Sequence, residues 1–171
     1  MDILPFIIKA GKLKEMKRKG WLRYGIDGES VASHIYRVAI ISMIVGENLS
    51  LNVEKLIKMA LLHDICEANI GDITPYDMEK KEKIEIERKE MKRLVESIGK
   101  REYYELWEEF VEGKSKEGKI LQEIDKFEMI LQAYEYEKKH MKNLEEFKKE
   151  EKNIKNPLLI SLLEEVKKLY G

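Results

Sequence analysis

The sequence contains little cysteine, proline or glycine. Cys66 is the only cysteine among 171 residues, so no disulfide can form within the chain and nothing in the cysteine content points to secretion. Ten glycines and three prolines leave few positions that interrupt regular structure, which favours long helices over many short strands. The sequence also lacks internal repeats, a low-complexity tail and any strand pattern longer than a few residues.

Long apolar runs are missing as well. No segment approaches the roughly 20 apolar residues that a membrane-spanning helix requires. The short apolar run near the start is preceded by an acidic residue and followed by a basic cluster, which is the reverse of a signal peptide. We therefore expect a cytoplasmic protein with no membrane partner.

The sequence has no excess of either charge. Lys and Arg number 32 and Asp and Glu number 33, so the net charge is close to zero. A protein that holds nucleic acid mainly through its phosphates shows a basic excess or a basic face. We therefore do not expect a nucleic acid polymer as a partner, and substrate specificity must come from a local site.

What the sequence does contain is helical periodicity. Apolar residues make up 43% of the chain, enough for one packed domain over residues 1–171. Their spacing predicts an all-α fold of about six to eight helices. The predicted helices span residues 2–17, 31–49, 53–68, 78–98, 101–111, 119–139 and 157–170.

Two of the three histidines lie on strongly apolar helical faces. His34 follows the core stripe of its helix, and His63 and Asp64 lie in the most apolar segment of the chain. An ionised carboxylate in such a place is costly unless it is paired or coordinates a metal. A divalent cation would satisfy the carboxylate and both imidazoles. For His34 alone, a core histidine bonded to a carbonyl remains the more common alternative.

A wider pattern resembles a known family. His34, the His63–Asp64 pair and the distant Asp125 match the H…HD…D pattern of the HD-domain metallophosphohydrolases. The segments ESVASHIYRVA, ALLHDICEANIGDITP, YELWEEF and DKFEMILQAYEYE resemble the HD-domain-containing protein 2 family, whose relatives are the bacterial 5′-deoxynucleotidases. The likeness extends from Gly20 to the final helix, and it implies a single HD-domain fold.

The resemblance also implies the roles of particular residues. The metal ligands would be His34, His63, Asp64 and Asp125, the last of which local sequence chemistry does not single out. The cofactor would be a divalent metal ion, with cobalt, manganese, zinc, nickel, iron and magnesium all left open. Glu67 and Asp72 would be the catalytic acids that serve the attacking water and the leaving group. Glu67 follows His63 by one helical turn in the predicted helix, which would place both on one face. A homodimer is implied as well.

Substrate contacts are expected near the start of the chain. Trp21 matches a tryptophan that the deoxynucleotidases place against the sugar, where it discriminates against a 2′-hydroxyl; on sequence alone it could equally pack a loop onto the core. The bacterial enzymes carry an arginine directly before this tryptophan, where this chain has Gly20. Arg18, Lys19 or Arg23 would then supply the charge that binds phosphate, and the preference for deoxyribose stays open.

The sequence and the resemblance together predict a metal-dependent phosphohydrolase that acts on (deoxy)ribonucleoside 5′-monophosphates, and the resemblance implies deoxyribonucleotides as its substrates. A nucleotide phosphodiesterase or pyrophosphohydrolase is the alternative within enzymes, because HD-domain enzymes share the metal site. A non-catalytic nucleotide-binding module with a structural metal is the alternative outside them. Glu67 and Asp72 argue against that module, since a structural metal site needs no extra acids beside its ligands.

Overall fold

The fold is built from helices alone, as predicted. The computed structural model describes residues 3–171, and in that range it contains no strand beyond a single isolated bridge between Lys17 and Ser30. The helices are α1 (Ile3–Lys12), α2 (Lys19–Leu22), α3 (Val31–Asn48), α4 (Val53–Leu62), α5 (Glu67–Ile70), α6 (Lys80–Ile98), α7 (Arg101–Glu112), α8 (Lys116–His140), α9 (Glu145–Lys148), the 3-10 helix η1 (Lys149–Asn153) and α10 (Pro157–Tyr170). No helix among these residues is long and apolar enough to cross a membrane.

Local signals determine several helix ends. Ser30 and Asn52 accept hydrogen bonds from backbone N–H groups in the first turns of α3 and α4, as predicted for N-cap residues. Asn156 does the same for α10, in which Pro157 occupies the first position. Gly99 ends α6 with a left-handed φ of 65°.

Two predicted helix ends are wrong for reasons that the structure makes clear. The first helix ends at Lys12 instead of residue 17, because the backbone of Met16 and Arg18 pairs with the segment that precedes α3. The long helix α8 begins at Lys116 instead of residue 119, because the side chain of Ser115 accepts a hydrogen bond from a backbone N–H in its first turn.

The predicted helix over residues 53–68 is interrupted at its polar residues. α4 ends at Leu62, and the chain then turns until α5 begins at Glu67. The N–H of Glu67 donates to the carbonyl of Asp64, a tighter i→i+3 bond than an α-helix makes. The indole of Trp107 donates to the carbonyl oxygen of His63 over 3.1 Å, so this carbonyl has a partner from another helix. His63 and Glu67 are thus not one turn apart on a continuous helix.

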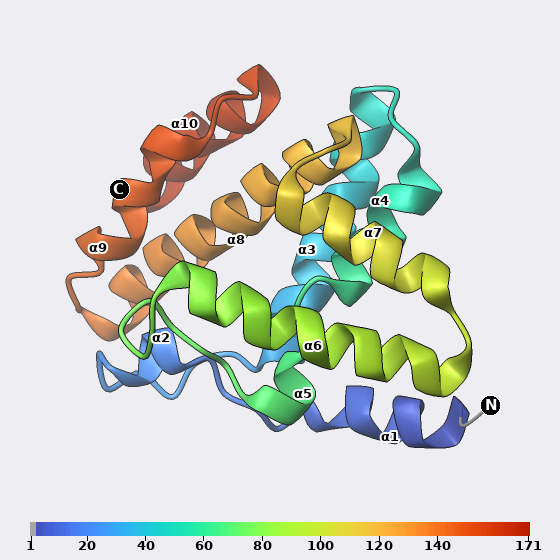
Figure 1. The fold of residues 1–171 in the computed structure, drawn as a ribbon. Helices are drawn as coiled ribbons and strands as arrows, with labels where there is room; N and C mark the ends of the chain where they lie inside the picture. Colours follow the sequence, from blue (N-terminus) through green and yellow to red (C-terminus); the bar gives the residue numbers. More distant parts are fainter. Residues whose placement is uncertain (1–2) are drawn as a thin grey trace.

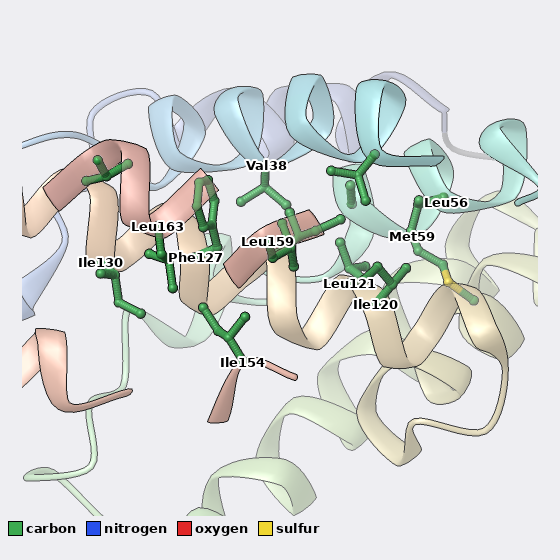
Figure 2. Close-up of a cluster of buried hydrophobic side chains, with 14 of the residues drawn as sticks. Val38, Leu56, Met59, Ile120, Leu121, Phe127, Ile130, Ile154, Leu159 and Leu163 are labelled. Atoms are coloured by element: carbon green, nitrogen blue, oxygen red, sulfur yellow. The ribbon is translucent and has the colours of Figure 1, made fainter. Parts of the chain in front are cut away.

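The helix α8 forms the centre of the main core. It runs diagonally through the molecule, with α10 on one side and α3 and α4 behind it (Figure 1). Figure 2 shows side chains from α3, α4, α8 and α10 meeting in this core; Val38, Leu56, Leu121 and Leu159 have no exposed surface. A second core around Trp107 joins α6 and α7 to the turn after α4. These two cores fix α3, α8 and the turn after α4 relative to one another.

Candidate metal centre

Three elements bring the four predicted metal ligands together. His34 comes from α3, His63 and Asp64 from the turn after α4, and Asp125 from the middle of α8. The Nε2 atom of His34 lies 3.0 Å from Asp125 Oδ1 and 3.4 Å from His63 Nε2. His63 Nε2 lies 3.2 Å from Asp64 Oδ2. The side chains therefore converge on one point, although they lie up to 91 residues apart in the sequence.

The orientation of both imidazoles suits a cation. His63 Nδ1 lies 2.7 Å from the carbonyl oxygen of Ala60, which can only accept, so Nδ1 carries the proton and Nε2 presents its lone pair. His34 Nδ1 is hydrogen-bonded to the carboxylate of Glu128, which directs its Nε2 toward the other predicted ligands. The Nε2 atoms of the two imidazoles thus face each other beside two carboxylates. Histidine, histidine and aspartate atoms within 4.8 Å of one another fit a transition metal.

The electrostatics of the ligand set also favour a positive charge. Burial and Arg18 lower the pKa of His34, but hydrogen bonds to Asp125 and Glu128 outweigh them and raise this pKa to about 9. Burial alone would raise the pKa of Asp64, yet the neighbouring imidazoles hold it well below its usual range. The imidazole of His34 therefore holds its proton tightly while the carboxylate of Asp64 stays ionised, and a divalent cation would take the place of that proton beside the carboxylate.

The sequence analysis missed the groups that hold His34. Glu128 has no exposed surface, and it binds His34 on one oxygen while the Nε of Arg37 donates to its other oxygen over 2.8 Å. Arg37 also donates to Gln132 and Glu135, both on α8. Asp125 and Glu128 are three residues apart on one helix, so their shared face was the signal available in the sequence.

A cavity of about 510 Å³ lies beside the metal ligands; we call it the Trp21 cavity. Of the nine predicted site residues, it is lined by Arg18, Trp21, Arg23, Asp64, Glu67, Asp72 and Asp125. His34 and His63 lie behind this wall and are almost fully buried. The structure therefore places the predicted catalytic acids, the predicted substrate contacts and the metal ligands around one space.

The two predicted catalytic acids are held differently. Asp72 accepts a hydrogen bond of 2.6 Å from the backbone N–H of Lys19, at the start of α2. Glu67 is only 4% exposed, and its nearest cation is Lys83 of α6, whose Nζ lies 3.8 Å away. Burial, followed by the charges of Asp64 and Asp72, raises the pKa of Glu67 well above its usual range. A carboxylate with a raised pKa is suited to accept a proton near neutral pH.

Trp21 lines the cavity but is only 1% exposed. Its ring packs on Phe147 at a centroid distance of 4.3 Å and meets Tyr136 edge-on at 5.2 Å. The indole Nε1 donates to Glu29 over 3.3 Å. Trp21 therefore combines a core position with a place in the cavity wall, so both interpretations drawn from the sequence retain a structural basis.

The two arginines of the Trp21 cavity differ in what they bind. Arg23 is at the rim, where its guanidinium lies over the ring of Tyr76 and 4.0 Å from Glu146. Arg18 lies deeper, and its Nη1 atom is 4.0 Å from Glu128. That nitrogen is buried, yet it has no hydrogen-bond partner among the described residues. A buried donor without a partner costs stability. An acceptor atom on a bound ligand would therefore form a favourable hydrogen bond with Arg18.

A second cavity, of about 450 Å³, lies between α6, α7 and α8; we call it the Trp107 cavity. Its lining includes Lys80, Ile84, Trp107, Phe110 and Gln122. The two cavities share residues 73–75 and the side chains of Asp64, Lys83, Asp125 and Lys126. Two of the predicted metal ligands, Asp64 and Asp125, therefore lie on a wall that both cavities share.

Comparison with known proteins agrees with this geometry. The family model described as HD domain matches residues 10–167. The chain belongs to the HD-domain family. The HD-domain fold and the all-α class predicted from the motifs are thereby confirmed, and the helical scaffold that carries the four converging side chains is that of the family.

Individual relatives of this HD-domain chain bear a consistent name. It is 41% identical over 150 residues to the 5′-deoxynucleotidase HDDC2 of Dictyostelium discoideum, covering 80% of this chain and 78% of the relative. It is 37% identical to the 5′-deoxynucleotidase hdd1 of Schizosaccharomyces pombe, covering 97% and 89%. A solved structure of a conserved hypothetical protein from Pyrococcus furiosus superimposes with a TM-score of 0.87 at 38% identity, covering 96% of this chain and 99% of that one.

Proposed function

We propose that this protein is a metal-dependent phosphohydrolase that releases phosphate from deoxynucleoside 5′-monophosphates. The observation that carries the proposal is the convergence of the four predicted metal ligands beside a cavity that is also lined by the two predicted catalytic acids and by two arginines. The relatives named 5′-deoxynucleotidase support the same reaction. The reaction adds water to the ester, so that the nucleoside leaves with a 5′-hydroxyl and inorganic phosphate is formed.

The residues of the site have separate tasks in this reaction. His34, His63, Asp64 and Asp125 would hold the metal, which when bound supplies a Lewis acid for the phosphoryl group and for water. Glu67 would accept the proton of the attacking water, because it is buried beside the ligands and its pKa is raised. Asp72, which also lines the Trp21 cavity, would assist the departure of the 5′-oxygen of the nucleoside.

Arg18 is the best-placed group for the substrate phosphate. Its buried Nη1 has no hydrogen-bond partner within residues 3–171, and a phosphate oxygen in the Trp21 cavity would provide one. Arg23 lies nearer the rim and already has Tyr76 and Glu146 as partners. Among the three cations considered from sequence, Arg18 therefore has the strongest structural support.

A substrate panel tests the proposal directly. Phosphate release is measured for matched deoxyribonucleoside and ribonucleoside 5′-monophosphates with cobalt, manganese, zinc, nickel, iron or magnesium added to metal-free protein. Release from at least one deoxynucleotide with at least one metal is expected. If every nucleotide stays intact with every metal while the protein binds the metal, the site is a non-catalytic module and the proposal is wrong.

The phosphodiesterase alternative has one observation in its favour. The Trp107 cavity lies on the other side of Asp64 and Asp125, and a phosphodiester has a second substituent that such a space could accept. A dinucleotide in the same panel separates the two activities. Faster cleavage of the diester than of any monoester would favour the alternative.

Trp21 provides a test of sugar preference. If its ring lies against the sugar, a ribose 2′-hydroxyl loses hydration without gaining a partner, which costs about 1 to 3 kcal/mol, or roughly 5- to 150-fold in kcat/KM. Trp21→Ala should therefore raise activity on ribonucleotides relative to deoxyribonucleotides. Arg23→Ala is the control, since loss of a phosphate contact weakens both sugars equally. An unchanged ratio in Trp21→Ala would make Trp21 a packing residue, and the deoxyribose preference would need another cause.

We further propose a homodimer and a cytoplasmic location. The outer face of α3 leaves Tyr36, Ile40 and Ile44 exposed on successive turns, an apolar stripe that a second copy would cover. One chain has a mass of 20.2 kDa, so sedimentation equilibrium should give twice this mass for the wild type. Ile44→Asp should lower the measured mass toward that of a single chain. A monomer at all concentrations would contradict the dimer.

A further inference from the structure

The site is rich in carboxylates and has few available cations. Asp64, Glu67, Asp72 and Asp125 all line the Trp21 cavity, so a phosphate monoester dianion must approach several negative charges. A bound divalent metal offsets only part of that repulsion. Positively charged side chains that are not already neutralised are therefore important for binding the phosphate.

Most cations around the two cavities already have carboxylate partners. Arg23 lies 4.0 Å from Glu146, and Lys83 lies 3.8 Å from Glu67 and 3.5 Å from Glu87. Arg18 lies 4.0 Å from Glu128 but keeps one nitrogen without a hydrogen bond among residues 3–171. Two lysines differ. Among residues 3–171, neither Lys80 nor Lys126 has a carboxylate oxygen within 4.0 Å.

Of these two lysines, Lys126 has the unusual environment. Lys80 is exposed and lines only the Trp107 cavity, so water satisfies its charge. Lys126 is partly buried and lines both cavities, directly after Asp125 on α8. Within residues 3–171 the ammonium group of Lys126 has neither an ion pair nor a hydrogen bond, so its charge is available to a bound anion. Its place on the shared wall next to a metal ligand indicates that its partner is an anion bound at the metal centre.

We propose that Lys126 binds the phosphate group of the substrate and of the product, from the side of α8. Arg18 would contact the same phosphate from the start of the chain, so the two cations would flank it. Lys126 is thus a binding residue for the phosphate alone and makes no contact with the nucleoside. The assignment rests on the proposed phosphohydrolase function, but phosphate binding can be measured without turnover.

The test measures binding of inorganic phosphate and of deoxyadenosine to manganese-loaded protein by calorimetry. Lys126→Ala is expected to weaken phosphate binding about tenfold, the lower range for a hydrogen bond to a charged group, and to leave deoxyadenosine binding unchanged. Lys126→Arg keeps the charge and should stay within about threefold of the wild type. Lys119→Ala is the matched control, because Lys119 is an exposed lysine of the same helix that lines neither cavity.

Three results would overturn the assignment. Phosphate binding within twofold of the wild type in Lys126→Ala would exclude a direct contact. Equal losses for phosphate and deoxyadenosine, or a loss of manganese, would show a structural effect through Asp125. An equal loss in Lys126→Arg would show that the positive charge is not what matters.

The proposed function can fail separately. If the wild-type protein binds phosphate through Lys126 yet releases none from any nucleotide, the phosphohydrolase proposal is wrong and the phosphate site stands. If nucleotides are hydrolysed but Lys126→Ala binds phosphate normally and keeps its KM, the function stands and Lys126 has no part in it.

Discussion

Asp64→Ala is expected to release the metal and to reduce phosphate release by about 1000-fold or more. Asp64 is the proposed ligand whose carboxylate lies between the two imidazoles, 3.2 Å from His63 Nε2 and 3.7 Å from His34 Nε2. Without it, two buried neutral imidazoles and one carboxylate remain to hold a divalent cation. Loss of the Lewis acid removes several kcal/mol of transition-state stabilisation, and about 1.4 kcal/mol corresponds to a factor of ten.

Metal content after dialysis, measured by mass spectrometry, checks this result alongside phosphate release. Asp27→Ala is the matched control, because Asp27 is a carboxylate with an 82% exposed side chain that, in the described part of the chain, forms an ion pair only with a surface lysine. Added metal should raise the melting temperature of the wild type and of Asp27→Ala but not of Asp64→Ala. Full metal occupancy in Asp64→Ala would contradict the assignment of the ligands.

Glu67→Gln is expected to retain the metal and the fold but to lose roughly 100-fold or more in kcat, as for the removal of a general base. The amide has nearly the same shape as the carboxylate, yet it cannot accept the proton of the attacking water. Because Glu67 makes no hydrogen bond to other described side chains and has Lys83 as its nearest cation, the substitution disturbs few contacts. KM should change little, since Glu67 acts on water.

Glu87→Gln provides the control for this substitution. Glu87 is a partly buried carboxylate that contacts the same Lys83 over 3.5 Å, but it lines only the Trp107 cavity. Its loss should leave kcat within a few-fold of the wild type. Asp72→Ala is measured in parallel, because Asp72 is the other predicted catalytic acid. Wild-type turnover in metal-loaded Glu67→Gln and Asp72→Ala would mean that other groups handle the proton.

The candidate site was accessible from the sequence to different degrees. His34 and the His63–Asp64 pair are conspicuous because polar groups on apolar helical faces need partners. Asp125 has no such signal, and only the family resemblance singled it out. Glu128 escaped notice for another reason: a glutamate on a helix with many charged residues looks solvated, and its burial depends on α3 packing against α8.

The interruption after Leu62 could not be predicted from local sequence. The segment has good helical periodicity, and its apolar residues alone favour one continuous helix. A partner 44 residues away decides otherwise, because the indole of Trp107 donates to the carbonyl of His63. The same holds for the approach of α7 to α8, where a Cβ on Gly118 would lie 2.5 Å from the carbonyl oxygen of Glu109. Nothing in the first turn of α8 reveals that its glycine faces another backbone.

The sequence by itself determined the all-helical class, the start of α3, the end of α6 and the start of α10, because a cap or a stop acts within one turn of the residue that supplies it. The tertiary structure alone decided how Glu128 orients His34, how Arg18 approaches Glu128, and which carboxylates become buried. These features arise from contacts between α8 and distant segments. Hydrogen bonds and charge interactions depend on distance in space, and local periodicity carries no information about that distance.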